Sequence, residues 1–372
     1  MKFTLVGPLP PYRGGIAHHT ARLAQGIRQA GHDLQVISFR SQYPSFLYPG
    51  TRQKDPVRHP RQVPAPAAYM LSPLNPLSWR QTAQSILRFC PQMIVLQWWL
   101  PFWAPAYASL ASRLRRAGIP LVFLVHNALP HERHWLDRQL ARMALGKGDA
   151  FIVHAPAEAR RLKEVLSLEQ PAVVIPHPLY DQFGPRLSRL PARQRLGLPL
   201  DAPLLLFFGF IRPYKGLHVL IDALALLPGI SRPHLLVAGE FWEDPRPYHR
   251  LVARLGLEDH VHFISHYIPD EDVAALFSAA DLFAAPYTQG TQSGALRIAM
   301  AYGLPILAST AAAPDTSYPL LQVFPPGDAC SLAAGIRRWL EDPPPPIASP
   351  PGREGWQKLV TVLVEFTTGM QR

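Results

Sequence analysis

Two basic residues follow an apolar run in the stretch GFIRPYKGL at 209–217. Gly209 ends the run, and Arg212 and Lys215 precede a helical pattern that starts near residue 216. A guanidinium and an ammonium group that converge at a helix start favour the binding of a diphosphate. Two solvated cations on a loop are the alternative, but the position directly after an expected strand favours the site.

A second loop, PYTQGTQSGALRIAMAYGLP at 286–305, is polar, contains glycine and has no carboxylate. Ser293 and Gly294 lie at an expected helix start, where backbone N–H groups lack partners within the helix. Ser293 could cap this helix, or the same amides could bind phosphate in another state, so both interpretations stay open. Gln292 offers a neutral amide that can hydrogen-bond sugar hydroxyls.

A third loop, GPLPPYRGGIAHH at 7–19, follows the expected first strand and precedes the first helix. Gly14 and Gly15 let the backbone approach a ligand closely, and the helix start offers N–H groups to an anion. A plain strand-to-helix turn is the alternative for this loop.

All three loops belong to an alternation of short apolar runs and amphipathic stretches, which predicts parallel α/β sheets. The pattern runs to VVIPHPLYDQF at 173–183 and then restarts, whereas the Pro-rich residues 41–80 indicate an irregular loop. Two domains in tandem would form a cleft at the carboxyl ends of their strands, where the loops lie. We therefore expect an N-terminal domain at 1–180, a C-terminal domain at 181–345, and at 346–372 a Pro-rich tether with a helix that returns to the first domain.

The motifs RGGIAHHTARLAQGIRQAGHDLQVIS, FFGFIRPYKGLHVLIDALALL, ISHYIPDEDVAALFSAADLFAAPY and AMAYGLPILAS together resemble glycosyltransferase family 4. The resemblance implies the GT-B fold, an α/β architecture of two Rossmann-like domains whose parallel sheets face a central cleft. It implies a metal-independent glycosyltransferase that uses a nucleotide-sugar donor. In such enzymes the equivalents of Arg212 and Lys215 hold the donor diphosphate, and those of Ser293 and Gly294 contact phosphate or sugar. The equivalents of Gly14 and Gly15 close over the donor.

The resemblance also implies roles at the end of another expected strand, in LVFLVHNALPHE. His126 occupies the position of a histidine that touches the donor sugar in the family, and we group it with Arg212 and Lys215 as catalytic. We expect Asn127 beside it to help hold the sugar. A histidine satisfied by neighbouring backbone is the alternative for His126.

One departure from the family concerns two glutamates that many members carry seven residues apart. An alignment on AMAYGLP places Gly290 and Ile298 at those positions. Glu240, which follows another expected strand, is then the nearest acid for a ribose or base contact. The leaving diphosphate still has Arg212 and Lys215 to stabilise it, so we expect activity, with the retention usual in the family. A non-catalytic sugar-nucleotide or glycan-binding relative is the alternative.

No metal or cofactor is expected from the sequence beyond the nucleotide-sugar substrate. His131 and His134 have no third ligand at a matching spacing. We expect His18 and His19 on a helix surface, with one of them facing an acceptor as the alternative, and His177 in a structural role. Asp270 and Asp272 need no metal either, because we expect them to begin a helix with Asp270 as its cap, and Cys90 and Cys330 fit no metal spacing.

The charge of the chain is concentrated in its first half. Residues 1–180 contain 21 Lys and Arg against 8 Asp and Glu, whereas 181–372 contain 16 against 18. Together with LQWWLPFWAPAY at 96–107 and the arginines that follow it, this excess predicts an anionic membrane surface as partner and a lipid-linked glycan or polysaccharide precursor as acceptor. Tryptophans that fill the core or line an acceptor groove are the alternative. No nucleic-acid-binding motif is present.

The N-terminal stretch MKFTLVGPLPPY predicts a first strand rather than a signal peptide, because its apolar part is short and ends at prolines. No apolar run approaches the roughly 20 residues needed to cross a bilayer. We therefore expect a cytoplasmic protein, with a peripheral position at the inner face of the cell membrane.

Overall fold

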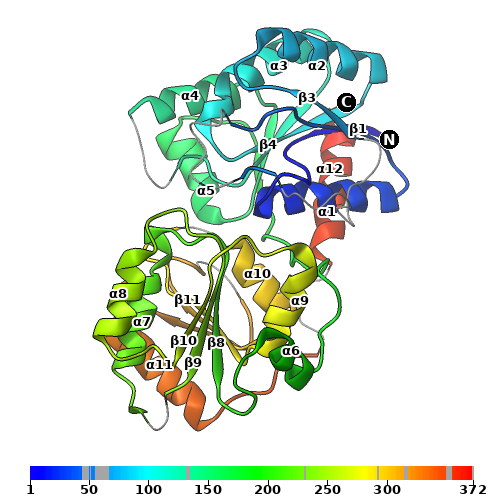
Figure 1. Ribbon diagram of the computed structural model, residues 1–372. Coiled ribbons are helices and arrows are strands. Elements are labelled where there is room, and N and C mark those ends of the chain that lie inside the picture. Colours follow the sequence, from blue (N-terminus) through cyan, green and yellow to red (C-terminus); the bar gives the residue numbers. More distant parts are fainter. Residues whose placement is uncertain are drawn as a thin grey trace. The chain divides into compact units, whose positions relative to one another are not determined.

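The computed structural model describes residues 1–43, 50, 52–54, 67–130, 135–229, 232–290, 293–313, 317–348 and 354–370. The chain divides into two compact units, each built on its own parallel sheet (Figure 1). The first unit comprises Met1–His177 and Glu354–Arg372, and the second comprises Pro178–Arg353.

The first unit contains a seven-stranded sheet in which every strand pair is parallel and the order is β3-β2-β1-β4-β5-β6-β7. Its central strands are nearly continuous apolar runs because helices cover both faces. The strands are β1 (Lys2–Val6), β2 (Asp33–Phe39), β3 (Ala67–Leu71), β4 (Met93–Trp98), β5 (Leu121–Val125), β6 (Ala150–Val153) and β7 (Ala172–Val174).

The helices of this unit lie on both faces of the sheet: α1 and α12 pack together, as do α2, α3 and α4 (Figure 1). The change of face follows from right-handed crossovers in a chain that first moves outward from β1 to β3 and then returns to β4. The helices are α1 (Gly15–Gln29), α2 (Pro76–Phe89), η2 (Pro101–Trp103), α3 (Ala104–Arg116), α4 (Trp135–Leu145), α5 (Pro156–Arg160), η3 (Arg161–Val165) and α12 (Gly355–Met370).

The expectation of an irregular segment at 41–80 is wrong for its second part, which contains β3 and the start of α2. The sequence of β3 predicts a strand only weakly, because its two alanines are less hydrophobic than the residues of the central strands. The prolines of this segment do not exclude a helix. Pro76 lies in the first turn of α2, where an N–H group would have no partner within the helix, so its absence costs nothing. Asn75 caps the helix by accepting hydrogen bonds from the N–H groups of Leu77 and Ser78.

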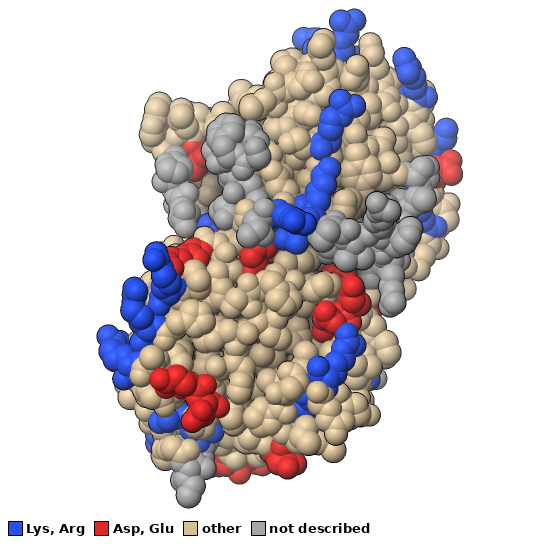
Figure 2. All heavy atoms as spheres, viewed as in Figure 1, with Lys and Arg blue, Asp and Glu red and all other residues tan. Residues whose placement is uncertain are grey.

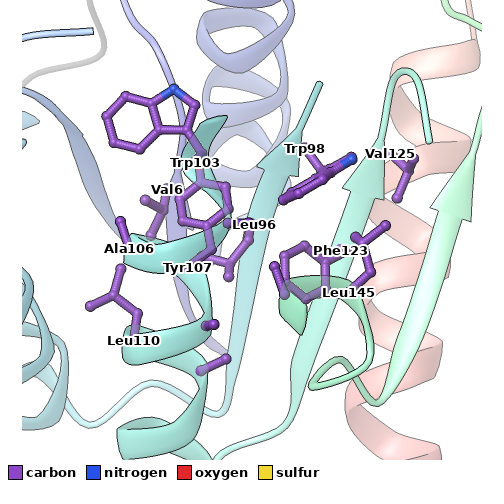
Figure 3. Close-up of a cluster of buried hydrophobic side chains, with 14 of the residues drawn as sticks. Val6, Leu96, Trp98, Trp103, Ala106, Tyr107, Leu110, Phe123, Val125 and Leu145 are labelled. Atoms are coloured by element: carbon purple, nitrogen blue, oxygen red, sulfur yellow. The ribbon is translucent and has the colours of Figure 1, made fainter. Parts of the chain in front are cut away.

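The aromatic stretch at 96–107 fills the core of the first unit (Figure 3). Trp98 and Trp103 are completely buried, and Trp99 is 8% exposed. Trp103 packs on Phe39 with ring centroids 4.1 Å apart. The interpretation of these tryptophans as membrane contacts is therefore wrong, and the core alternative is correct.

The second unit contains a six-stranded parallel sheet with the order β10-β9-β8-β11-β12-β13. Its strands are β8 (Leu204–Phe208), β9 (His234–Ala238), β10 (Val261–Ile264), β11 (Leu282–Ala285), β12 (Ile306–Ser309) and β13 (Leu321–Phe324). Its helices are α6 (Arg189–Leu196), η4 (Pro213–Lys215), α7 (Leu217–Ala225), α8 (Arg246–Arg254), α9 (Asp270–Ala279), α10 (Gly294–Ala301) and α11 (Ala329–Glu341).

The acids at the start of α9 have a structural role. The capping residue is Pro269 rather than Asp270, and Asp270 and Asp272 lie in the first helical turn, where negative charge is favourable. Asp272 also forms an ion pair with Arg195 of α6. Within the described segments, no helix is both long enough and apolar enough to span a bilayer.

Candidate functional site

The strand order of the second unit determines where a ligand could bind. The order reverses between β8 and β11, which are neighbours although β9 and β10 separate them in sequence. At such a switch point the loops after the two strands diverge to opposite faces and leave room at the sheet edge. The described parts of these loops are residues 209–216 and 286–290, and they belong to the basic and polar loops identified in the sequence.

The two loops are in direct backbone contact. The N–H of Thr288 donates a hydrogen bond of 2.7 Å to the carbonyl oxygen of Tyr214. Gly216 has φ +69°, and a Cβ atom there would lie 2.0 Å from the carbonyl oxygen of Pro286. Gly209, at φ +101°, would place a Cβ 3.1 Å from Nζ of Lys215. Glycine is therefore required at Gly216, where both the dihedral angle and the available space exclude a side chain.

Lys215 is a buried cation in this loop, with 9% of its surface exposed. Burial and, secondarily, the nearby charge of Arg212 lower the pKa of Lys215 to about 7. Its Nζ lies 5.7 Å from the ring centroid of Tyr287, and no acid among the described residues raises its pKa. A buried ammonium group in such surroundings is poised to be charged when an anion arrives.

Arg212 lies next to aromatic rings. Its guanidinium carbon is 5.3 Å from the ring centroid of Tyr214 and 5.7 Å from that of Trp242. Trp242 in turn packs on Phe210 at 4.3 Å with an interplanar angle of 30°. Two half-buried rings beside a guanidinium form a surface on which a planar base can stack.

The start of α10 contributes hydroxyl groups and a third cation. Ser293 caps the helix, since its Oγ accepts a hydrogen bond of 3.2 Å from the N–H of Leu296, and it also contacts the hydroxyl of Tyr287 at 2.9 Å. Gly294 would place a Cβ 3.4 Å from the ring of Tyr180. Arg297, one turn into α10, was not selected from the sequence. Burial lowers its pKa to about 10, and the signal for it was an arginine in an otherwise apolar helix.

The other donor-site predictions in this unit have separate positions. Glu240 follows β9 and is buried, and its carbonyl oxygen accepts a hydrogen bond of 2.9 Å from the N–H of Ile211. Gly290, at φ +140°, and the buried Ile298 occupy the positions aligned with the family's glutamates. Gln292 lies outside the described residues.

The first unit has its own switch point, between β1 and β4. Gly14 and Gly15 end the loop after β1, and Gly14 is the capping residue of α1 with φ +112°. Gly15 is exposed, and a Cβ there would meet no atom within 4 Å. Gly14 is therefore required by its backbone conformation, whereas Gly15 leaves open space at the helix start.

His126, which follows β5, belongs to a cluster of four buried imidazoles with His19, His154 and His177. Its Nε2 contacts the side-chain oxygen of Gln97, and the amide nitrogen of Gln97 lies 3.4 Å from Nδ1 of His19. The expected surface position of His19 is wrong, because the ring is completely buried. Burial first, and neighbouring imidazoles second, keep the pKa values of His19 and His126 well below the ordinary value.

The four histidines are distant in the chain, so no single sequence motif joins them. Position at strand ends was the available signal for His126, and it applies equally to His154, which directly follows β6. Asn127 is half-buried next to His126. His131 and His134 lie outside the described residues.

The basic excess of the sequence lies in the first unit, and the second unit is close to neutral. The first unit contains 23 Lys and Arg against 10 Asp and Glu, and the second contains 14 against 16. In Figure 2 the visible face of the first unit shows mainly Lys and Arg, whereas that of the second shows both signs. Three exposed arginines lie near the end of α3: Arg113, Arg115 and Arg116.

Both halves of the chain match models of known protein families. The model described as Glycosyltransferase Family 4 matches residues 13–182, and the one described as Glycosyl transferases group 1 matches residues 202–342. The D-inositol 3-phosphate glycosyltransferase of Thermomonospora curvata is 30% identical over 307 residues, which is 72% of this chain and 70% of that protein. The enzyme of the same name from Streptomyces scabiei is 32% identical over 222 residues, which is 52% of this chain and 48% of that protein. The chain spans about half the length of several curated relatives that it matches.

Solved structures show the same fold. The Anabaena protein Alr3699/HepE in complex with UDP has a TM-score of 0.69 at 20% identity and covers 100% of this chain and 98% of its own. The sucrose-phosphate synthase of Thermosynechococcus elongatus has a TM-score of 0.67 at 19% identity, with 100% and 97% covered. Two parallel α/β units, each matched by one of the two family models, and a relative that is 30% identical over 72% of this chain show that the chain belongs to the family 4 glycosyltransferases and has the GT-B fold.

Proposed function

We propose that the chain transfers a glycosyl residue from a nucleotide-sugar donor to a hydroxyl group of an anionic acceptor. One observation carries the proposal: Lys215 is a buried ammonium group at the switch point of the second sheet, beside Arg212. A diphosphate would supply the negative charge that this group otherwise lacks among the described residues.

In the proposed reaction the bond between the anomeric carbon of the sugar and the diphosphate oxygen breaks. The acceptor oxygen attacks the same face and forms the new glycosidic bond, so the configuration is retained. The acceptor proton passes to the departing diphosphate. Negative charge grows on the diphosphate as it leaves, and Lys215, Arg212 and the first N–H groups of α10 stabilise it there. No carboxylate base is needed for this route.

We propose a uridine nucleotide as the first donor to test. One structural relative, Anabaena Alr3699/HepE, is named with UDP and with UDP-glucose bound, and these names apply to that protein. In this chain the Phe210–Trp242 pair offers a stacking surface next to Arg212, and the buried Glu240 on the adjacent strand could accept hydrogen bonds from ribose or base.

We propose that the acceptor carries a phosphate or diphosphate. The relatives are named for D-inositol 3-phosphate, and lipid-linked glycans share its phosphate chemistry. The basic excess of the first unit supports an anionic acceptor of either kind. Assays with inositol phosphate and with a polyprenyl-diphosphate-linked sugar distinguish the two sources.

For a lipid-linked acceptor, we propose that α4 contacts an anionic membrane surface. Trp135 is 78% exposed, and Leu136 and Met143 are also exposed on this helix. Arg138 and Arg142 on the same helix are exposed and cationic. This combination suits a membrane interface, unlike the buried tryptophans of the core. Binding to phosphatidylglycerol vesicles should decrease in Trp135→Ala, and equal binding to neutral vesicles would exclude the proposal.

A non-catalytic nucleotide-sugar-binding protein is the second candidate. The observation that favours it is the presence of Gly290 and Ile298 where many family members carry glutamates. Such a protein would bind the nucleotide sugar with the same cations but would not turn it over.

The test is a panel of UDP-, GDP- and ADP-sugars, measured by thermal stabilisation and then by hydrolysis and transfer. We expect one class of donor to raise Tm and to be turned over. Lys215→Ala should reduce turnover by roughly 100-fold or more, whereas Arg250→Ala, which removes an exposed cation of the same unit, should not. Binding without turnover on any acceptor would establish the second candidate, and the absence of binding to every donor would refute both.

A further inference from the structure

Four imidazoles of the first unit converge from separate elements. His19 lies on α1, His126 follows β5, His154 follows β6, and His177 lies beyond β7. One ring nitrogen from each lies within 4.8 Å of the corresponding nitrogen of every other. Across the described ranges, no other set of three or more histidine, cysteine or acidic side chains is arranged to hold a metal ion.

The ring of His19 supplies an independent indication of a ligand. It is completely buried, and its Nε2 has no hydrogen-bond partner among the described residues. A buried polar nitrogen without a partner costs free energy, so such atoms usually have a protein, water or metal partner. The rings around His19, with centroids 4.7, 5.0 and 5.3 Å away, bring further nitrogens toward it.

His154 already has the tautomer of a metal ligand that binds through Nε2. Its Nδ1 donates a hydrogen bond of 2.9 Å to the carbonyl oxygen of Ile175, which leaves the lone pair of a neutral ring on Nε2. Metal-bound histidines commonly donate their other N–H group to a backbone carbonyl in this way.

Gln97 limits how many of the rings can bind a metal. Its amide lies between Nδ1 of His19 and Nε2 of His126, and it has only one oxygen that can accept a hydrogen bond. A ring that accepts from the amide NH₂ group must carry its proton on the other nitrogen. Only one of the two rings can therefore present its other nitrogen to a metal ion. Amide oxygen and nitrogen are interchangeable by a flip of Gln97, and one flip gives His19 an available Nε2.

We propose that the first unit binds a divalent transition-metal ion of the zinc type through His19, His154 and His177, with Gln97 and His126 as the layer that orients His19. The all-imidazole ligand set selects Zn²⁺, Co²⁺ or Ni²⁺ over Mg²⁺ and Ca²⁺, which prefer oxygen. Bonds of about 2.0–2.1 Å place tetrahedral ligands about 3.4 Å apart, so the nitrogens need to move inward by less than about 1 Å. Three protein ligands leave a fourth position for water.

This site differs from the sequence-based expectation that no metal is bound. The competing interpretation is a metal-free aromatic cluster, in which the four imidazole rings pack on one another. The ring of Trp356 adds to this cluster, since its centroid lies 4.9 Å from that of His19. The two interpretations differ in metal uptake. A bound ion would also link α1, the end of β6 and the segment after β7, and it would stabilise the unit by mass action.

The test uses the full chain, stripped with chelator and titrated with Zn²⁺ by calorimetry and with Co²⁺ by visible absorption. We expect one ion per chain, a higher Tm with Zn²⁺, and the intense absorption bands of tetrahedral Co²⁺. His154→Ala should weaken binding at least about 100-fold. His234→Ala is the matched control, because it also removes a histidine that contacts another histidine, but in the second unit. Nδ1 of His234 lies 3.0 Å from Nε2 of His262. UDP binding by the second unit is measured in parallel to separate this result from the proposed transferase function.

Gln97→Glu provides a variant with the opposite expectation. A carboxylate accepts hydrogen bonds from both His19 and His126, so both outward nitrogens become available and Zn²⁺ binding should tighten roughly tenfold or more. Gln97→Leu should weaken it. If His154→Ala does not fold, His177→Gln replaces it, with circular dichroism as the check. No Zn²⁺ uptake above buffer, or uptake lost in His234→Ala but kept in His154→Ala, would refute the site.

Discussion

The two sheets present very different chemistry at equivalent edges. Each sheet has a switch point beside its first strand, at β1–β4 in one unit and β8–β11 in the other. The second edge is lined with buried or half-buried cations, of which Lys215 has a pKa of about 7. The first edge is lined with neutral imidazoles around Gln97. One edge thus suits an anion, and the other suits a transition metal or an uncharged sugar.

The edges also differ in what fixes their loops. Gly216 of the second unit packs against the carbonyl oxygen of Pro286, so backbone meets backbone. Gly7 of the first unit packs against side chains, since a Cβ there would lie 2.7 Å from Cγ of Gln97 and 2.9 Å from Oγ1 of Thr20. Backbone contacts cannot relax as readily as side-chain contacts. The anion site should therefore be the more rigid of the two.

The largest effect is expected for Gly216→Ala. The positive φ and the carbonyl at 2.0 Å require the loop to shift, at a cost of about 3 kcal/mol or more in the free energy of unfolding. Gly256→Ala is the matched control, because Gly256 has φ +62° with no atom within 4 Å, and about 1 kcal/mol is expected. Urea denaturation measures both. Equal costs would show that the contact between the loops is unimportant.

A smaller effect, with opposite signs for stability and binding, is expected for Lys215→Met. Removal of a buried ammonium group should raise the free energy of unfolding at pH 7 by at least about 1 kcal/mol, because burial disfavours its charge. UDP binding should weaken roughly 100-fold because the diphosphate loses its buried cation. Denaturation and calorimetry test the two parts. A destabilised variant with unchanged UDP affinity would contradict the assigned role of Lys215.

A rise in pH from 7 to 8 should weaken UDP binding by up to about tenfold. The pKa of Lys215 in the free protein is lowered to about 7, and a bound diphosphate raises it. Below pH 7 the group is charged in both states, so it adds no pH dependence. Above pH 7 the free protein loses the proton and the complex keeps it, so the dissociation constant rises by up to about tenfold per pH unit. Lys215→Arg, which stays charged, should give a flat profile between pH 7 and 9 if it binds UDP.

The smallest effect is expected at the edge of the first unit. Gly7→Ala should cost about 1–2 kcal/mol in stability, since Gln97 and Thr20 can adjust by rotation. Because Gln97 would move, Zn²⁺ affinity should fall as well. Gly15→Ala is the control, since its new methyl group meets nothing within 4 Å and should change stability by less than about 0.5 kcal/mol. A loss as large as that of Gly216→Ala would remove the distinction between the two edges.

Much of the fold could be predicted from the sequence. The apolar run in MKFTLVGPLPPY located β1 closely, because strands buried on both faces must be continuously apolar. The segment 41–80 was not predictable in the same way. Strand β3 lies at a sheet edge and has few strongly apolar residues. Pro76 suggests the end of a helix unless Asn75 is recognised as the cap of α2. The basic loop was found because Arg212 and Lys215 are adjacent in sequence. Arg297 was missed because one arginine in an apolar helix is ordinary.

The sequence by itself determined the alternation of strands and helices, the family, and the cations that follow β8, because each of these is encoded in contiguous residues. Only the tertiary structure decided that Trp98 and Trp103 fill a core, that Lys215 is buried, and that four histidines distant in the chain meet around one point. The physical reason is that burial and convergence depend on which strands become neighbours. Strand order in a parallel sheet is fixed by long-range packing rather than by local sequence.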